Sequence, residues 1–512
     1  MIEDGIETDS LKKRYISKLS TNIVGMAVNL IAQAVIPRGL GPKAYGDYNF
    51  LMNFFTELVN FLDMGTSTCF YTELSRRRGE HELVRFYVRF AGLLCLIVFG
   101  FVAVVNISGG CREIWPGQDM YYVYLSAGLA ALTWILKVLN SIADAHGLTV
   151  SSEFARMGHR ILWLVLILAF YSTQGLALGS FFYCSIAALF MLAAAYFLIM
   201  KKNVLSLKFT GGVAAALIKK YMHDFYSYSH PFFAYSLIGF AVVVADRWLL
   251  QQFGGSVQQG FFGLASQMGA FSFLFAGAMT PLFIREFSIS YGSNDIVHMG
   301  HLYRRYIPPL FSLVAYFSCF VAAQAEKAIY IFGGPGFREA GQVVTIMAFL
   351  PIHQTYGQLS SSVFLATGQT RLYTNIGIVF MLLGLPLTYF LVASHDRMGL
   401  NAGAAGLAIK MVLMQFVGIN VQIYFNTKLL KLPFYKYFIH QFASVGFLLA
   451  IALAAAFLAD GPLGFGRMPV AGFLLSGVLY TLMTFCMVCG VPALFGLKRS
   501  DIRSVFARMS FK

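Results

Sequence analysis

The sequence predicts an all-α integral membrane protein of about fourteen transmembrane helices that contains a duplicated unit. Three observations support this fold class. The mean hydropathy is +0.67 and only 12% of the residues are charged, which is far from the composition of a soluble protein. Apolar segments of about 20 residues, the length that spans a bilayer, follow one another along the chain. Short sequence matches also recur between its two halves.

About fourteen segments have the length and apolarity of a membrane span, and the longest loop between them, 201–230, has room for about one helix. The span at 160–174 is short for a helix that crosses a bilayer. The predicted spans are 18–36, 47–72, 88–107, 120–143, 160–174, 177–200, 231–252, 260–283, 305–324, 341–366, 373–394, 400–425, 438–459 and 469–494.

The repeat is visible in three matched motifs. FYTELS at 70–75 is matched by FIREFS at 283–288, an offset of 213, and Gly79 is matched by Gly292 at the same offset. The pair Gly-x4-Gly at 41–46 recurs at 255–260, and AHGLT at 145–149 recurs as ATGQT at 366–370. Matches in the same order with slowly growing offsets predict a duplication in the same orientation. This pattern is typical of transporters in which two bundles rock about a central site.

The basic residues predict the orientation in the membrane. Of the 38 Lys and Arg residues, 28 fall on the side that holds both termini, 7 on the other side and 3 inside spans. Cytoplasmic loops carry the excess of Lys and Arg, so both termini are expected in the cytoplasm. The net charge of +15 therefore reflects topology and contact with lipid headgroups rather than nucleic-acid binding.

Signals of enzyme or metal chemistry are weak. The glycine-rich run at 333–336 lacks the Lys-Ser/Thr of a phosphate-binding loop. The histidines show no metal-ligand spacing, and no nucleophile elbow is present. The pair Cys486-x-x-Cys489 lies in an apolar span, where small thiols usually pack between helices. We therefore expect no catalytic residues, no metal and no cofactor.

Polar side chains inside spans are costly and are functional candidates for that reason. Asn22, Asn29 and Gln33 share one face of the first span. Gln354 and Gln358 repeat this pattern in the tenth span. Such residues either line a cavity or form hydrogen bonds between helices.

Three basic residues are predicted inside spans. Lys410 lies near the middle of its span, too far from either end for its ammonium to reach the interface, so it is expected to face water or an anion. Lys137 lies nearer the cytoplasmic end of its span, and Arg247 lies towards the outer end of another. Either could be an interfacial anchor or a ligand contact.

Three acidic residues are candidates for ion coupling. Glu57 and Asp63 lie in the second span, six residues apart, so they do not share a face. Asp63 is interpreted mainly as a partner in an ion pair, and Glu57 as the better proton carrier. Asp246 precedes Arg247 in the seventh span.

The motifs at helix ends resemble those of a known family. PRGLGPKAYGDYNFL at 37–51 and FLDMGTSTCFYTELSRR at 61–77 resemble the N-terminal signature of polysaccharide flippases, which belong to the multidrug/oligosaccharidyl-lipid/polysaccharide exporter superfamily. ADRWLLQQFGG at 245–255 resembles the start of the second half, and IFGGPGFREA at 331–340 the loop before the tenth helix. The resemblance covers residues 15 to about 430, and the last two spans fit a fourteen-helix member.

This resemblance implies two six-helix lobes around a cavity that opens to each side in turn, followed by two C-terminal helices. The implied segments are a cytoplasmic N-terminal segment at 1–17, an N-lobe at 18–200, a cytoplasmic amphipathic linker at 201–230, a C-lobe at 231–426, the last two spans at 427–496 and a basic cytoplasmic tail at 497–512.

The resemblance also implies a function. Family members move an oligosaccharide linked to undecaprenyl pyrophosphate across the bacterial inner membrane for capsule, O-antigen or exopolysaccharide synthesis. The expected partners are this glycan lipid, membrane lipids, and a glycan polymerase with its chain-length regulator. Coupling to a proton or sodium gradient is possible. Lys410, Lys137 and Arg247 match the cationic cavity of related flippases, because a pyrophosphate leaving water needs charged hydrogen-bond donors. Further candidates to contact the head group in this cavity are Asn29, Gln33, Gln354 and Gln358.

Three alternatives stay open at this point. A multidrug exporter of the same superfamily would favour acidic cavities, and the three basic and three acidic residues within the spans disfavour it only mildly. A lipid II flippase is a second alternative. A membrane-bound glycan polymerase or ligase is a third, although the short external loops and the repeat speak against it.

Overall fold

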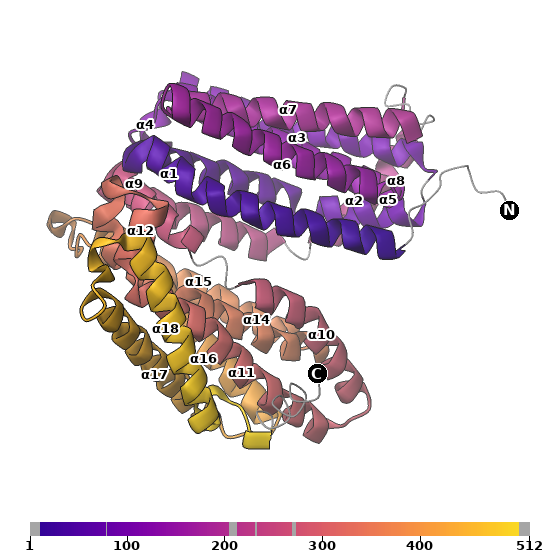
Figure 1. Ribbon diagram of the computed structural model, residues 1–512. Coiled ribbons are helices and arrows are strands. Elements are labelled where there is room, and N and C mark those ends of the chain that lie inside the picture. The colour runs from indigo at the N-terminus through magenta and orange to yellow at the C-terminus, as the bar shows by residue number, and fades with distance from the viewer. Residues whose placement is uncertain (1–10, 78, 204–211, 231–232, 269–272, 501–512) are drawn as a thin grey trace. The chain divides into compact units, whose positions relative to one another are not determined.

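The computed structural model describes residues 11–77, 79–203, 212–230, 233–268 and 273–500. Within these ranges the chain forms helices and no strands, as Figure 1 shows. The helices up to residue 268 are α1 (Leu11–Asp63), α2 (Thr66–Arg76), α3 (His81–Ile107), α4 (Cys111–Ile114), α5 (Met120–Ala145), α6 (Thr149–Thr173), α7 (Leu178–Asn203), α8 (Ala215–Ser229) and α9 (Phe233–Met268).

The second half continues the all-helical pattern, which confirms the predicted fold class. Its α-helices are α10 (Phe273–Gly292), α11 (Ile296–Ala323), α12 (Ala325–Phe332), α13 (Gly341–Met347), α14 (Leu350–Ala366), α15 (Thr370–Val392), α16 (Gly403–Leu429), α17 (Phe434–Asp460) and α18 (Pro469–Gly490). Short 3-10 helices follow at η3 (Pro335–Ala340), η4 (His395–Arg397), η5 (Phe465–Arg467) and η6 (Pro492–Phe495).

Parts of five predicted segments lie outside the described residues. These are 1–10 of the N-terminal segment, residue 78 of the N-lobe, 204–211 of the linker, 231–232 and 269–272 of the C-lobe, and 501–512 of the basic tail.

Eleven of the described helices are long and apolar enough to cross a membrane. The predicted spans map onto more segments than this because α1 and α9 are each two helices joined at a kink. The spans 18–36 and 47–72 fall mostly in α1, and the described parts of the spans 231–252 and 260–283 fall in α9 and α10. The span 341–366 is divided between α13 and α14, and α14 has only 17 residues.

Several predicted span boundaries differ from the helix ends, and two of these differences have a clear cause. The span placed at 160–174 is the 25-residue helix α6, which begins at Thr149. Charged residues in its first half hid the true start, and Arg156 is in fact paired with Glu153 there. The span placed at 47–72 stops at Asp63, because Met64 and Gly65 both have positive φ (39° and 80°) and turn the chain before α2 begins.

The chain divides into two compact units, Met1–Gly260 and Phe261–Lys512. In the first unit, α1, α3, α5 and α7 pack around a core that includes Phe55, Tyr87 and Trp134. The short helix α8 packs on α2 and α3 with a face that buries Tyr221 and Phe225. The Tyr221 hydroxyl donates to Glu80 Oε1 at 2.8 Å. Burial, reinforced by this carboxylate, raises the pKa of Tyr221, so the hydroxyl stays protonated as a donor.

In the second unit, α10 packs on α14, α11 on α17, α15 on α16, and α17 on α18. Phe311, Tyr356, Ile423 and Tyr480 are fully buried in its core. A buried amide pair between α16 and α17 adds polar contacts: Gln441 Nε2 donates to Asn420 Oδ1 at 2.8 Å. The C-terminal helices are therefore packed on the rest of this unit.

The kinks of α1 and α9 occur at matched positions of the sequence repeat. Gly41 has φ 72° and ψ 170°, and Gly255 has φ 69° and ψ −173°. Only glycine adopts this conformation readily. The AHGLT and ATGQT motifs also match, since Gly147 (φ 83°) joins α5 to α6 and Gly368 (φ 71°) joins α14 to α15. The duplicated sequence motifs thus produce duplicated backbone conformations.

Just after each kink, the two helices pack backbone against backbone within the first unit. A Cβ on Gly46 would lie 1.7 Å from the carbonyl oxygen of Ser256, and a Cβ on Gly260 would lie 2.1 Å from the carbonyl oxygen of Pro42. Ser256 also hydrogen-bonds Asp47 beside this crossing. The second glycine of each Gly-x4-Gly motif is therefore required because the two helix backbones lie too close for a side chain, and not because of its own φ and ψ.

Candidate functional site

A polar cavity of about 390 Å³ lies between α14, α15 and α16 in the second unit. Its lining consists of Gln354, Gly357, Gln358, Ser361, Tyr373, Gln415 and Gln422. Gln354, Gln358 and Ser361 come from one face of α14, as their spacing predicts. Gln415 and Gln422 come from α16, seven residues apart and so again on one face. No charged residue lines this cavity.

Lys410, on α16, is packed against α15. Its side chain is buried, and a Cβ on Gly384 would lie 2.7 Å from its Cε. Lys410 is five residues before Gln415, which turns it about 140° away around the helix. The lysine and the cavity glutamines thus lie on different faces of α16.

Lys137 and Asp63, which the sequence placed in different spans, are neighbours. Lys137 Nζ lies 3.6 Å from Asp63 Oδ2, with the lysine side chain 58% exposed and the carboxylate buried. Asp63 also accepts from the hydroxyl and the backbone N–H of Ser67, from the Thr66 hydroxyl and, at 3.3 Å, from Tyr87. This carboxylate joins the end of α1 to the first turn of α2.

The remaining polar candidates of α1 are more open. Asn29 is exposed, and Gln33 and Glu57 are partly buried. Among the described residues, Glu57 has no hydrogen-bond or ion-pair partner, which distinguishes it from Asp63.

Arg247 and Asp246 lie in α9 before its kink. Arg247 Nη1 donates to Gln259 Oε1 at 3.1 Å, and the Gln259 amide donates back to the Arg247 carbonyl oxygen. This reciprocal pair bridges the kink at Gly255. Asp246 is buried.

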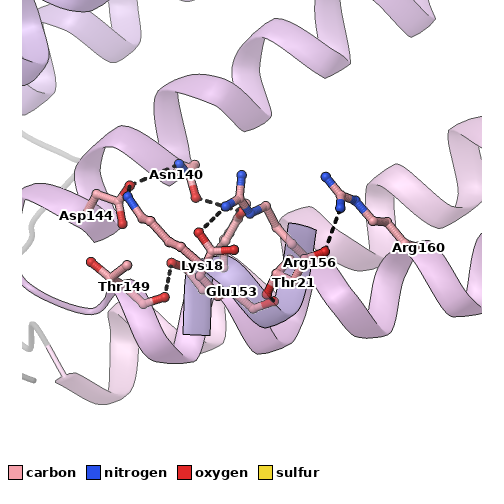
Figure 2. A network of polar contacts seen from close by, with 10 residues as sticks. Lys18, Thr21, Asn140, Asp144, Thr149, Glu153, Arg156 and Arg160 are labelled. Carbon is pink, nitrogen blue, oxygen red and sulfur yellow. Dashed lines mark hydrogen bonds and ion pairs between the residues drawn. The ribbon is translucent and has the colours of Figure 1, made fainter. Parts of the chain in front are cut away.

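A polar network that the sequence analysis did not anticipate joins α1, α5 and α6 (Figure 2). Glu153 is fully buried and pairs with Arg156 one turn later. Arg160 Nη1 donates to the Thr21 carbonyl oxygen at 3.0 Å, and Lys18 Nζ lies 3.3 Å from Asp144 Oδ2. The late predicted start of α6 had left Glu153 and Arg156 outside the membrane helices.

A second cavity, of about 480 Å³, is almost wholly apolar and lies between α17 and the helices α11, α13, α14 and α16. Phe311, Phe349, Leu413, Phe416 and Phe442 are among the residues that line it. Among the described residues, no group of three His, Cys, Asp or Glu side chains is arranged to hold a metal ion.

Two of the cavity glutamines, Gln415 and Gln422, were missed by the sequence analysis, which singled out only Lys410 in the same helix. Their seven-residue spacing is the same signal that identified the polar face of the first span. The sequence therefore contained this signal, but only the charged residue of the helix, Lys410, was singled out as a candidate.

The family model of polysaccharide biosynthesis proteins matches residues 11–283, more than half of the chain. The chain belongs to this family. The match runs from the start of α1 into α10, and so contains both Gly-x4-Gly motifs. It confirms the family resemblance of the motifs at 37–51, 61–77 and 245–255. No curated protein sequence matches the chain.

Solved structures share the fold at low sequence identity. Lipid II flippase MurJ, in an inward closed conformation, has a TM-score of 0.67 at 13% identity, over 93% of this chain and 99% of its own. An inward-facing multidrug resistance transporter of the MATE family has a TM-score of 0.60 at 16% identity, over 81% of this chain and 99% of its own.

A third structure, a transporter of the MOP superfamily from Pyrococcus furiosus, has a TM-score of 0.52 at 16% identity, over 82% of this chain and 95% of its own. The chain thus has the fold that these flippases and multidrug transporters share. This fold and the eleven candidate membrane helices among the described residues agree with a multi-pass membrane protein.

Proposed function

We propose that the chain is a flippase of the bacterial inner membrane that translocates an oligosaccharide linked to undecaprenyl pyrophosphate by alternating access. The observation that carries this proposal is the family match over more than half of the chain, together with a flippase fold that extends over 93% of it. The delivered glycan would then enter O-antigen, capsule or exopolysaccharide synthesis, alongside a polymerase and its chain-length regulator. Both termini would lie in the cytoplasm.

The extent of the structural likeness favours a flippase over a multidrug exporter. The flippase structure aligns with 93% of this chain and the multidrug transporter with 81%. The apolar cavity beside α17 supports the same choice, because a groove lined by phenylalanine and leucine suits a hydrocarbon chain. A polyprenyl tail would rest against α17 while the head group crosses the protein.

The anionic head group would be met by Lys137, Lys410 and Arg247. Of the three, Lys137 has the most open side chain and is held beside Asp63 without being enclosed. Lys410 is enclosed between α15 and α16, so its ammonium would have to emerge as these helices shift. Arg247 already donates to Gln259, a partner that a pyrophosphate oxygen would have to replace. Asn29 and Gln33 would add neutral contacts from α1.

Coupling to a proton or sodium gradient would pass through Glu57, Asp63 or Asp246. Glu57 is the strongest of these, because Asp63 is already engaged by several hydrogen-bond donors and Glu57 by none in the described structure. The test is to measure glycan export in a Glu57→Gln variant with and without an uncoupler. If the uncoupler reduces export in this variant as much as in the wild type, Glu57 does not carry the coupling ion.

The decisive experiment is to locate the glycan lipid in a strain that lacks the gene. Intact spheroplasts are treated with a membrane-impermeant lectin or oxidant, and the polyprenyl-linked glycans are then extracted. Complete repeat units protected on the cytoplasmic leaflet, with surface polymer lost, are the expected result. Units that reach the outer leaflet normally would contradict the flippase function, and units that accumulate there unpolymerised would indicate a polymerase.

The same strain tests the basic residues. Lys410→Ala is expected to reduce surface polymer strongly with a normal level of folded protein in the membrane, because an anion in a low-dielectric site loses a charged donor. Lys220→Ala, at an exposed position of α8, is the matched control and should export normally. Normal polymer in the Lys410→Ala strain would remove Lys410 from the mechanism.

A lipid II flippase is the second candidate, since the structure with a TM-score of 0.67 has that function. The glycan extracted from the mutant strain separates the two candidates. Trapped peptidoglycan precursor with growth arrest would identify the cell-wall substrate, and trapped polysaccharide repeat units in viable cells would identify the proposed one.

A further inference from the structure

The polar cavity between α14, α15 and α16 combines three properties: open volume, many hydrogen-bonding groups and no charge. Its volume of about 390 Å³ falls within the range of small-molecule sites, roughly 300–1,000 Å³. Four amides, from Gln354, Gln358, Gln415 and Gln422, converge on it.

The four side-chain amides form no hydrogen bonds within the described part of the protein. In the part of the chain that the structure describes, none of their side chains has a hydrogen-bond partner, and the buried Oε1 atom of Gln422 is unsatisfied. A buried polar atom without a partner destabilises the folded protein, because it has lost its hydrogen bonds to water and gained none in return. The other glutamine of this region, Gln441, shows the contrast because it is paired with Asn420 on a neighbouring helix. The cavity amides are therefore available to a ligand.

The residue types define the ligand that fits. Each amide offers a carbonyl acceptor and two N–H donors. The hydroxyls of a sugar need both kinds of partner at once, whereas a phosphate needs donors with positive charge and an organic cation needs carboxylates or aromatic faces. Tyr373 adds a ring with a polar tip, held against Phe364 with ring centroids 6.0 Å apart.

We infer that this cavity is a binding site for an uncharged sugar unit of the transported glycan, separate from any contact to the pyrophosphate. The role of this cavity in transport rests on the proposed function. Within that function, Gln354 and Gln358 would bind the saccharide and not the head group. Lys410 lies on another face of α16 and is not part of the cavity. Head group and sugar are thus recognised by different chemistry.

The test uses the purified full chain in lipid nanodiscs and saturation-transfer NMR. The probes are the methyl glycosides of glucose, galactose, mannose and N-acetylglucosamine, with inorganic pyrophosphate and tetraphenylphosphonium as charged comparisons. We expect saturable binding of at least one glycoside. Gln415→Leu and Gln422→Leu should each weaken it roughly tenfold, the effect of losing one good hydrogen bond.

Gln342→Leu is the matched control, since Gln342 is exposed on α13 and does not line the cavity. It should bind the glycosides as the wild type does. Tyr373→Phe, which removes one hydroxyl and keeps the ring, guards against a folding defect and should weaken binding less than the glutamine substitutions. Size-exclusion profiles confirm that each variant is folded.

Three results would overturn the inference. In the first, no glycoside shows saturable binding, which would mean that the cavity holds only water. In the second, both leucine variants bind the glycosides as well as the wild type does. In the third, the leucine variants lose binding of pyrophosphate or of the organic cation but keep binding of the glycosides. Failure of the flippase function gives a different result. Glycosides would still bind in a glutamine-dependent way, while the strain lacking the gene would show normal placement of its glycan lipids.

Discussion

Buried carboxylates in the first unit illustrate how neighbours decide the role of a charged residue. Asp63 accepts hydrogen bonds from Thr66, Ser67 and Tyr87, and Lys137 lies beside it. Glu153 is buried more deeply and depends on Arg156. Removing one partner of a buried ion pair leaves an uncompensated charge, whereas an exposed partner can be replaced by water.

This difference predicts unequal effects at the two ends of the Asp63–Lys137 pair. Asp63→Ala orphans several donors at the start of α2, and each one left buried costs about 1–3 kcal/mol. Lys137→Ala removes a side chain that is 58% exposed, so its effect on stability should be below about 1 kcal/mol. Thermal unfolding in detergent, followed by tryptophan fluorescence, should show a clear fall in melting temperature for Asp63→Ala alone.

Asp63→Asn is the control for this comparison, because an amide oxygen still accepts hydrogen bonds. The melting temperature of Asp63→Asn should lie between those of the wild type and Asp63→Ala. Equal melting temperatures for Asp63→Ala and Lys137→Ala would show that the hydrogen bonds to α2 do not contribute to stability.

At the residue scale, the sequence identified Lys137 and Asp63 as unusual but could not pair them. They are far apart in the chain, and only the packing of α5 against the end of α1 brings them together. The sequence also could not show that Lys410 is enclosed by α15, because the small residue that admits it, Gly384, belongs to a different helix.

The repeated Gly-x4-Gly motif acts at the scale of elements. Its first glycine sets a kink by its positive φ, and its second allows two backbones to touch. The repeat was recognisable in the sequence because both demands exclude a side chain. That the two motifs meet each other was not recognisable, since nothing in a one-dimensional repeat indicates that its copies are in contact.

We predict that Gly46→Ala and Gly260→Ala disrupt this crossing. The added Cβ would fall 1.7 Å and 2.1 Å from backbone carbonyl oxygens, which cannot move aside as a flexible side chain can. Both variants should show a reduced yield of monodisperse protein in fluorescence-detected size exclusion.

The matched controls for these variants are Gly79→Ala and Gly292→Ala. These glycines are also matched by the repeat, but neither has any atom within 4 Å of an added Cβ, and neither has positive φ. Both controls should give wild-type yields. A normal yield for Gly46→Ala would mean that the helices can separate at this point without cost.

At the scale of the whole molecule, the distribution of Lys and Arg predicts a topology that can be measured directly. A cysteine placed at Lys219 on α8 should be protected from a membrane-impermeant thiol reagent in intact cells, and one at Arg338 on η3 should be labelled. A background without the seven native cysteines, all of which are free, is required. The opposite labelling pattern would reverse the orientation proposed for the chain.

The sequence by itself determined the all-helical membrane class, most of the spans and the family. Apolar length, the distribution of charge and the conformational demands of glycine are local properties, and they leave direct traces in the order of residues. The predictions from sequence were wrong where a contact in the folded protein stabilises charged residues inside a helix. The ion pair of Arg156 with Glu153 carries α6 through a charged stretch that looked like a loop.

Only the tertiary structure decided which polar residues act together. Gln354 and Gln358 share a cavity with Gln415 and Gln422 because α14 and α16 pack side by side, and Lys410 is turned away from it by its place on α16. The same packing places an apolar cavity beside α17. Spacing within one helix predicts a face, but which faces meet is set by the packing of distant helices, and that information is not present in any single segment.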